Sequence, residues 1–224
     1  MANLDHLVIG ARDLEQGIAW AHDILRVDIP RGGEHVKMST HNCVMRLGGN
    51  VYFEIIAINP DAPPIKHPRW FGLDEPDVRT RIASTPVLLT WAVNTAAIAG
   101  GFEALRNACE HPPTSIHAMQ RDNLQWQVAF PDDGTLVDGG LFPLVIEWAV
   151  SPHPARAMRD LGCRLRGLSL RSTDPKTLTR KLACIGALEA LGGNPVEPAS
   201  RNELVATLDT PAGTLELSSL GEPG

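Results

Sequence analysis

The sequence has no excess of basic residues and no long apolar run. Its 224 residues include 20 Lys and Arg against 26 Asp and Glu, which gives a formal net charge of −6. Nucleic acids and anionic membrane surfaces carry charge of the same sign, so they gain no electrostatic attraction to such a protein. No segment approaches the roughly 18 consecutive apolar residues that a membrane-spanning helix needs. We therefore expect neither a nucleic-acid partner nor a membrane.

Cysteine motifs of the metal-binding kind are also missing. The four cysteines lie far apart, with no CxxC pair and no histidine at a structural-zinc spacing. We expect core thiols in a reducing cytoplasm, and the N-terminal segment lacks the features of a secretory signal. No GxSxG, GxGxxG or P-loop run is present. These motifs therefore give no guide to activity.

The patterning indicates a folded α+β protein built from a repeated unit. Hydrophobic residues make up 43% of the chain and charged residues 21%, which are values typical of globular proteins. Period-two and helical patterns follow each other in the order of one strand, one helix and three strands. The first unit has a helix that begins at Asp13, where Gln16 completes a capping box, and a hairpin turn at Gly48-Gly49-Asn50.

The same order returns twice more along the chain. In the last copy Asp174 before Pro175 marks a helix start, and the strands are shorter and more polar. We expect paired βαβββ modules and an appended third βαβββ-like unit. The predicted units lie at 1–59, 86–150 and 151–224, the first two forming one domain over 1–150.

Two glutamates lie in strands that are apolar on both faces. Glu54 follows Phe53 in the last strand of the first unit, and Glu147 follows Ile146 in the matching strand of the second. An ionised carboxylate in such a place costs several kcal/mol unless a cation or several donors compensate it. Two hypotheses stay open. The glutamates share one site between the units, or each pairs with an arginine or projects at a sheet edge.

His6 lies on the first strand, with Leu4 and Val8 on the same face. A lone histidine at such a position is typical of a hydrogen-bonded core residue. Together with Glu54, however, its imidazole nitrogen suits a divalent metal of the Zn, Mn, Fe or Ni kind. The pair therefore makes a metal site a specific hypothesis.

Several segments resemble the glyoxalase-like branch of the vicinal oxygen chelate superfamily. They are the strand and helix LDHLVIGARDLEQGIAWAHDIL, the THN before a hairpin, the strand YFEIIAI and the later RWFGLD. The resemblance is close over 4–74 and weaker through PLVIEWAVSPHP. It implies two βαβββ modules whose mixed sheets curl around a cleft, where His or Glu from first and last strands holds a metal.

On this resemblance, His6 and Glu54 match the ligand positions of the first module. Glu147 matches the last-strand ligand of the second module and is also a candidate catalytic residue. The first strand of that module, 87–93, has no His, Glu or Asp for a fourth ligand. Three protein ligands with open positions are typical of a catalytic metal. A missing ligand is equally what a member without a metal would show.

Other candidates lie near the expected cleft. His41, in the THN segment, is predicted to move protons or replace a metal ligand, or else to be a surface histidine paired with Asn42 or water. Asn42 is a candidate substrate contact. Arg69 beside Trp70 is able to clamp a carboxylate and stack on a flat ligand, although such a loop can also simply anchor itself through Trp70.

Aromatic residues of the second unit are candidates for the wall of the cleft. Trp91 and Trp148, on its first and last strands, are predicted to be core or cleft wall, and Trp91 in the latter case is a substrate contact. His35, after Gly32-Gly33, is placed to close over the same cleft.

The leading hypothesis is a divalent-metal-dependent enzyme that acts on a small oxygenated organic molecule and stabilises an enolate or oxyanion intermediate. The superfamily that the chain resembles includes lyases, isomerases, dioxygenases and resistance proteins, so the fold selects no reaction. The alternative is a metal-free protein that sequesters a small ligand in the same cleft. A small-molecule partner is expected in both cases, and a homodimer is left open.

Overall fold

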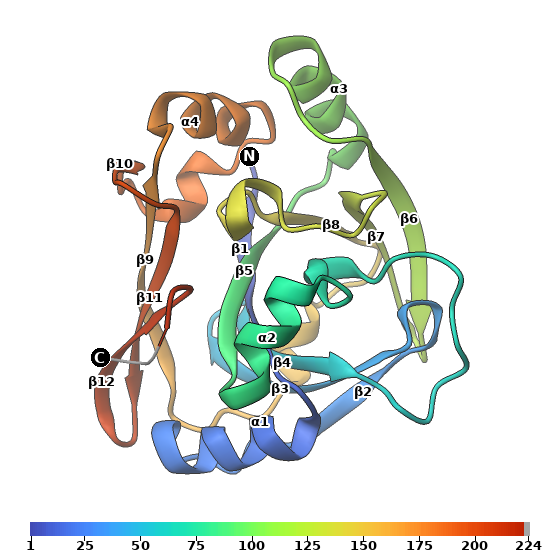
Figure 1. Cartoon of the computed structure of the whole chain (residues 1–224), viewed down its shortest axis with the longest axis vertical. Coiled ribbons are helices and arrows are strands. Elements are labelled where there is room, and N and C mark those ends of the chain that lie inside the picture. Colours follow the sequence, from blue (N-terminus) through green and yellow to red (C-terminus); the bar gives the residue numbers. More distant parts are fainter. Residues whose placement is uncertain (222–224) are drawn as a thin grey trace.

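The computed structural model describes residues 1–221, which fold into two β-sheets with helices around them (Figure 1). The larger sheet has eight strands in the order β2-β3-β4-β1-β5-β8-β7-β6. Its strands are β1 (Asn3–Gly10), β2 (Arg31–His35), β3 (Thr40–Gly48), β4 (Val51–Ile58), β5 (Val87–Asn94), β6 (Thr114–Arg121), β7 (Leu124–Pro131) and β8 (Leu144–Trp148). Each predicted module supplies one half of this sheet. The α+β fold class with repeated βαβββ modules is confirmed.

The two modules meet along the antiparallel pair of β1 and β5, where Leu7 lies opposite Trp91. Within each module the first strand lies beside the last one in parallel, β1 beside β4 and β5 beside β8. His6 on β1 and Glu54 on β4 are therefore neighbours in space. The sheet curls so far that its edges approach each other, and Lys37 Nζ, just after β2, donates to the carbonyl of Ala118 on β6 at 2.8 Å.

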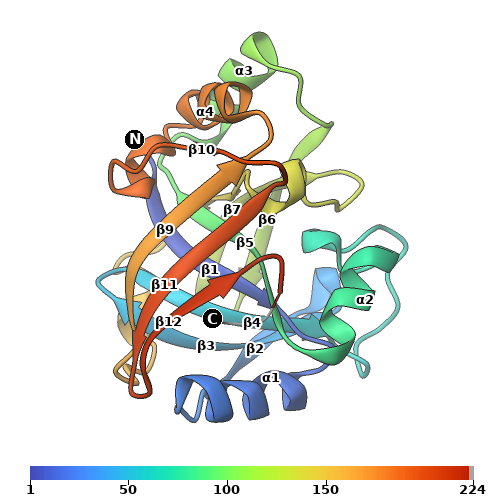
Figure 2. The ribbon, with the colours of Figure 1, turned by 60° about the vertical axis from the view of Figure 1, so that its left-hand side comes forward.

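The third unit forms a second sheet that packs against the larger one (Figure 2). Its strands, in the order β10-β9-β11-β12, are β9 (Arg164–Ser172), β10 (Glu197–Pro198), β11 (Glu203–Thr210) and β12 (Gly213–Ser218). Leu7 and Phe53 of the larger sheet belong to the same buried cluster as Leu170 and Leu208 of the smaller one. A single apolar core thus joins the third unit to the paired modules.

Capping residues set the starts of two helices as predicted. α1 (Leu14–Trp20) begins after Asp13, whose carboxylate accepts the backbone N–H of Gln16 at 2.7 Å. Gln16 Oε1 in return accepts the N–H of Arg12, one residue before the expected partner, at 2.8 Å. The remaining α-helices are α2 (Pro76–Ser84), α3 (Ile98–Ala108) and α4 (Pro175–Cys184). α4 follows Asp174, which accepts the N–H of Thr177 at 3.0 Å.

Three segments differ from the expected pattern. A short helix, Val36–Met38, replaces the end of the strand that follows Gly33. α2 begins with a proline between the modules and is too weakly periodic to be recognised in the sequence. β8 is shorter than the expected strand over 141–150, because the chain makes a tight turn before it. The short helices are η1 (Ala21–Leu25), η2 (Val36–Met38), η3 (Trp70–Gly72), η4 (Val137–Gly140), η5 (Pro154–Ala157) and η6 (Leu188–Leu191).

No helix within residues 1–221 combines the length and the apolar character that crossing a membrane requires.

The turn that leads into β8 is fixed to β5. Thr90 Oγ1 donates to the carbonyl of Gly140 and Trp91 Nε1 to the carbonyl of Leu141, both at 2.9 Å. Gly140 has a φ of +94°, and a Cβ there would lie 2.0 Å from the carbonyl oxygen of Leu89. Such an approach leaves room for glycine alone. It places β8 in register with β5.

Replacing Gly140 by alanine should therefore destabilise the protein more than the same change at Gly139. Gly139 also has a positive φ, +68°, but a Cβ there would make only an ordinary contact with Asn202 at 3.6 Å. We expect Gly139→Ala to cost about 1–2 kcal/mol through backbone strain, and Gly140→Ala to cost clearly more. Urea unfolding of both variants measures the difference, and equal costs would show that the turn adapts to a side chain.

Candidate functional site

A cavity lies between the two modules on the concave side of the larger sheet. It encloses about 510 Å³, including its open mouth. Most of its wall is apolar, and three of the five tryptophans of the chain line it: Trp70, Trp126 and Trp148. Its polar side chains are His6, His35, Asn42, Tyr52, Glu54 and Arg121. A mostly apolar cavity with a few converging polar groups is the usual form of a small-molecule site.

Glu54 and His6 are brought together in this cavity. On β4, Tyr52 and Glu54 line the cavity and Ile56 lies in the buried cluster on the same face, while Phe53 and Ile55 belong to the core on the other face. His6 Nε2 lies 3.4 Å from Glu54 Oε2. The other carboxylate oxygen accepts a hydrogen bond of 2.6 Å from Asn42 Nδ2. Glu54 is only 5% exposed, so an amide and an imidazole are its near partners among the described residues.

Asp5 lies directly behind His6 and is fully buried. Neighbouring residues of a strand normally face opposite sides, but the pairing of β1 with β5 shifts between Leu4 and His6, which makes Asp5 the extra residue of a β-bulge. The bulge turns both side chains toward each other. Asp5 Oδ1 consequently lies 2.7 Å from His6 Nδ1.

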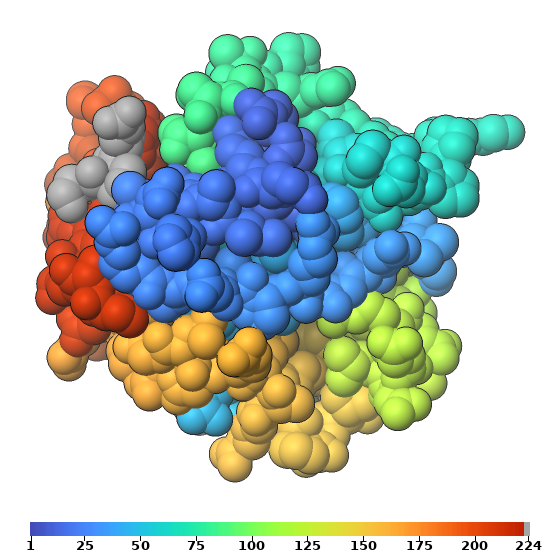
Figure 3. Space-filling view, turned by 90° about the horizontal axis from the view of Figure 1, so that it is seen from below, coloured from blue at the N-terminus to red at the C-terminus, as the bar shows by residue number. Residues whose placement is uncertain are grey.

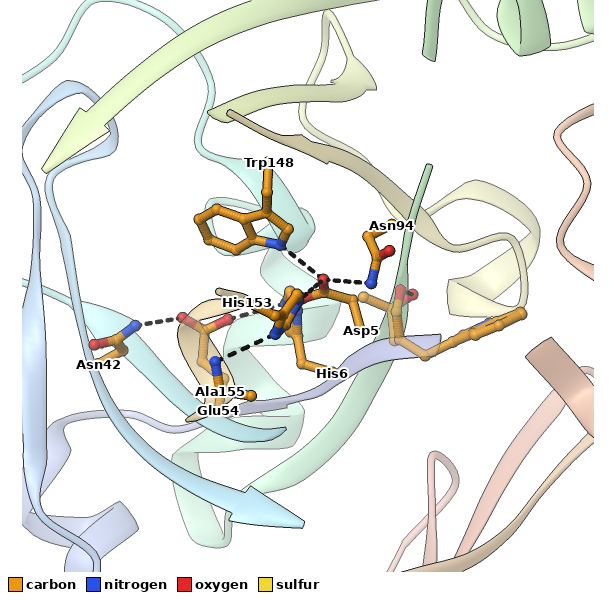
Figure 4. A network of polar contacts seen from close by, with 10 residues as sticks. Asp5, His6, Asn42, Glu54, Asn94, Trp148, His153 and Ala155 are labelled. Atoms are coloured by element: carbon orange, nitrogen blue, oxygen red, sulfur yellow. Dashed lines mark hydrogen bonds and ion pairs between the residues drawn. The ribbon is translucent and has the colours of Figure 1, made fainter. Parts of the chain in front are cut away.

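Three further donors surround the second oxygen of Asp5 (Figure 4). Oδ2 lies 3.0 Å from Asn94 Nδ2, 2.8 Å from Trp148 Nε1 and 2.8 Å from His153 Nε2. His153 Nδ1 accepts the backbone N–H of Ala155, so the proton of a neutral His153 is on Nε2 and is donated to Asp5. Four side-chain groups thus surround the buried carboxylate, one at Oδ1 and three at Oδ2.

The charges of this group stabilise one another. Burial opposes the charge on His6, but hydrogen bonds with Asp5 and Glu54 raise the pKa of His6 to about 9. Burial would likewise raise the pKa of Glu54, yet His6 and Asn42 lower it to about 2. The pKa of Asp5 is lowered for the same reasons, by His153 and His6. At neutral pH an imidazolium thus lies between two carboxylates.

His35 and Arg121 close one side of the cavity where the sheet edges approach. Arg121 Nη1 is 3.4 Å from His35 Nε2, and His35 Nδ1 is 3.2 Å from Thr40 Oγ1. Because arginine only donates, His35 accepts at Nε2 and carries its proton on Nδ1. Burial lowers the pKa of His35 to about 4. It is a neutral group at the cavity wall.

The mouth of the cavity is formed by two segments that are distant in sequence. Leu124 comes from the tip of the β6–β7 hairpin, and Pro154 and Met158 come from the segment after β8. Figure 3 shows this hairpin tip and the segment around residues 150–160 on the same side of the molecule.

Asn42 and Trp70, two of the predicted substrate contacts, lie at this cavity. Trp70 is 3% exposed, packs edge-on against His35 at 5.0 Å, and its buried indole N–H has no partner among the described residues. Trp148 also lines the cavity, as one of its two predicted placements requires. Their roles in binding remain predictions.

The structure places four other candidates away from His6 and Glu54. Glu147 faces the opposite side of β8, where Oε2 accepts the N–H of Ile98 at 2.9 Å. There the carboxylate lies at the N-terminus of α3, which is the positive end of the helix dipole. Trp91 is fully buried in the shared core, and Arg69 forms an ion pair with Asp74 at 2.6 Å. His41 alternates with Asn42 and is turned from the cavity, and burial lowers its pKa.

The structure brings only two of the three predicted metal ligands together. Glu147 is engaged with α3, and no group of three His, Cys, Asp or Glu side chains suited to a metal occurs in residues 1–221. The second module offers Trp148 instead of a ligand at the corresponding side of the cavity. This donor set does not fit the three-ligand centre that the resemblance implies. Dependence on a divalent metal stays a prediction.

Comparisons with known proteins now agree with this architecture. Residues 4–186 match the family model described as a glyoxalase-like domain. The chain belongs to this family. The predicted membership in the vicinal oxygen chelate superfamily, glyoxalase-like branch, is confirmed. No curated protein matches the chain.

Two solved structures of low sequence identity are similar to this chain. A hypothetical protein from Staphylococcus aureus has a TM-score of 0.56 at 12% identity, over 90% of this chain and 88% of that one. The methylmalonyl-CoA epimerase from Mycobacterium tuberculosis has a TM-score of 0.43 at 17% identity, over 69% of this chain and 91% of that one. The likeness to the Staphylococcus aureus protein shows the fold alone.

Three residues of the site are not indicated by the sequence pattern. Period two places Asp5 on the face opposite His6, and no local signal marks the bulge. His153 lies in a proline-containing segment that predicts only a joint between units. Asn94 is the last residue of β5 and has no polar pattern around it. Long-range contacts alone bring them together.

The raised pKa of His6 predicts a decline of stability on the alkaline side. Between the ordinary value of 6.5 and about 9, the folded protein holds a proton on His6 that the unfolded chain has released. Its contribution is complete below pH 6.5 and is lost as the pH rises through about 9. Urea unfolding is measured at several pH values across this window. The free energy of unfolding of the wild type should fall as the pH rises, and that of His6→Gln should fall less.

The matched control is His22→Gln, because His22 is an exposed histidine near Asp28. This variant should keep the slope of the wild type. Equal slopes for wild type and His6→Gln would mean that His6 is not charged in the folded protein.

Proposed function

We propose that this protein binds a small oxygenated organic molecule with an apolar or aromatic body in the cavity, without a bound metal, and that Glu54 accepts a hydrogen bond from it. The observation that supports the proposal is the incomplete hydrogen bonding of Glu54. The buried carboxylate has one short hydrogen bond, 2.6 Å from Asn42, and a longer contact of 3.4 Å with His6. Strong charge-assisted hydrogen bonds are about 2.7–2.9 Å long. A hydroxyl or N–H group of a ligand would complete the set.

A second group in the cavity calls for an acceptor. Trp70 has a buried indole N–H with no partner among the described residues, and a buried donor of this kind costs stability until it is satisfied. A ligand with an oxygen acceptor that reaches this N–H would satisfy Trp70 in addition to Glu54. Trp126 and Trp148, with ring centroids 5.4 Å apart, supply flat apolar surface for its body.

Binding agrees better with the charges than acid–base catalysis does. A general base works best when its pKa lies near the operating pH. The pKa of Glu54 is lowered to about 2 because His6 and Asn42 stabilise its charge. Glu54 is therefore a persistent acceptor and a weak base. This argues against Glu54 as a general base, whereas the lack of a third metal ligand beside His6 and Glu54 within residues 1–221 supports the metal-free ligand-binding hypothesis.

Glu54→Gln should weaken binding, and Glu147→Gln is its matched control. Catechol, salicylate and mandelate are suitable probes, since each has an apolar ring with neighbouring oxygens, and quenching of tryptophan fluorescence follows their binding. Losing a hydrogen bond to a charged group should raise Kd about 10- to 100-fold in Glu54→Gln. Glu147→Gln should bind as the wild type does. Equal Kd values in the two variants, or no binding of any probe to the wild type, would contradict the proposal.

Metal analysis tests the other part of the proposal. Protein purified without chelator should contain well below one equivalent of Zn, Mn, Fe or Ni, and EDTA should leave its Tm unchanged, because within residues 1–221 only two of the three predicted ligands, His6 and Glu54, lie together. Stoichiometric metal in the wild type that is lost in Glu54→Gln would contradict this expectation and would support the metal-dependent enzyme instead. Glu147→Gln again serves as the control.

A further inference from the structure

A second cavity, of about 360 Å³ including its mouth, adjoins the first at the end of β7. Phe71 and Leu144 line both cavities and form the wall between them. The second cavity is apolar for the most part. Phe102 comes from α3, Phe130 from β7, and Leu136 from the loop before η4.

His111 brings an unsatisfied polar atom to this apolar cavity. Its Nδ1 is buried and has no hydrogen-bond partner among the described residues. The ring lies between two aromatic side chains, with centroids 5.9 Å from Phe102 and 4.8 Å from Phe142. Burial lowers the pKa of His111 to about 4, so the ring is neutral at neutral pH and either donates or accepts at Nδ1 according to its tautomer.

The hydroxyl groups of the second cavity are already engaged. Thr90 Oγ1 donates to the carbonyl of Gly140, and Thr114 Oγ1 donates to the carbonyl of Pro112, both at 2.9 Å. Thr135 Oγ1 donates to Asp133 at 2.7 Å. Nδ1 of His111 is therefore the polar side-chain atom of these lining residues that still lacks a partner among the described residues.

Phe71, in the wall between the cavities, is held in an uncommon conformation. Its φ and ψ are 61° and 20°, a left-handed conformation that is strained for a bulky residue. The N–H of Gly72 donates to the carbonyl of Gly134 at 2.7 Å, which holds the loop in place. Strained backbone of this kind persists where the surrounding structure enforces it, often beside ligands.

From these observations we infer that the second cavity is a subsite for the far end of the ligand. The ligand would be an elongated amphipathic molecule, with its oxygenated end at Glu54, an apolar stretch past Phe71 and Leu144, and a terminal hydroxyl or carbonyl at His111. This inference rests on the proposed function, and it adds the length and the second polar group that the ligand must have.

Catechols of different length test the subsite. Catechol, 4-butylcatechol and 4-(4-hydroxybutyl)catechol are titrated into the wild type and followed by tryptophan fluorescence. Each methylene that enters an apolar cavity should tighten binding by up to about fourfold. Leu136→Trp, which fills the second cavity, should remove this gain and leave the Kd of catechol unchanged.

The role of His111 is tested by comparing the ligands with and without a terminal hydroxyl. His111→Leu should lose the preference for 4-(4-hydroxybutyl)catechol over 4-butylcatechol, while His117→Leu should keep it. His117 is a suitable control because its Nε2 is also buried and unpartnered among the described residues, yet it does not line the second cavity and lies on the other side of Phe130, in a groove next to it. A preference that survives in His111→Leu would overturn the role of His111.

The failure of this inference differs from the failure of the proposed function. If catechol binds but the butyl group adds nothing, or adds as much in Leu136→Trp, the second cavity is not a subsite although the proposed function stands. If no catechol binds, butylbenzene is titrated and the ring resonances of His111 are followed by NMR. Shifts that Leu136→Trp abolishes support a ligand cavity there, and unchanged resonances overturn it.

Discussion

The buried carboxylate of Asp5 is the constraint on which the site depends. An ionised group without access to water must be surrounded by donors. Asp5 obtains them from His6 on β1, Asn94 on β5, Trp148 on β8 and His153 beyond it. These donors come from both modules and from the segment that leads to the third unit. The need to compensate the charge of Asp5 therefore fixes the relative positions of the two modules and this segment.

The same constraint explains why the cavity is asymmetric although the fold is repeated. The first module contributes the charged pair of His6 and Glu54, whereas the second contributes tryptophan surface. Glu147, which the repeat suggests as the partner of Glu54, instead caps α3 from the other face of β8. The two modules thus share the order of their strands and helix, while their side chains contribute different chemical groups to the cavity.

The sequence predicts the elements well because their signals are local. Alternation in β4 correctly places Glu54 with Tyr52 and Ile56 on one face, and Asp13 and Asp174 mark their helix starts. The fold, and the pairing of His6 with Glu54, follow from those signals together with the family resemblance. Glu147 could not be placed in the same way, because Ile146 and Trp148 face the cavity and a change of one residue in register exchanges the faces of a strand.

What the pattern cannot supply are features that arise between distant segments. The bulge at Asp5 depends on how β1 pairs with β5, and His153 reaches Asp5 only after the chain has passed through both modules. The approach of Arg121 to His35 depends on the curl of the whole sheet. Such contacts leave no periodic pattern in the sequence, so local patterning does not predict them.

The hydrogen bond from the Ala2 N–H to the carbonyl of Gly186 links the start of the first module to the third unit. Ala2 is buried, and it stands immediately before β1, the strand that carries Asp5 and His6. Strand ends commonly fray on their own. Here fraying of β1 requires opening of the joint with the third unit, so the cavity and the C-terminal sheet are expected to lose structure in a single cooperative transition.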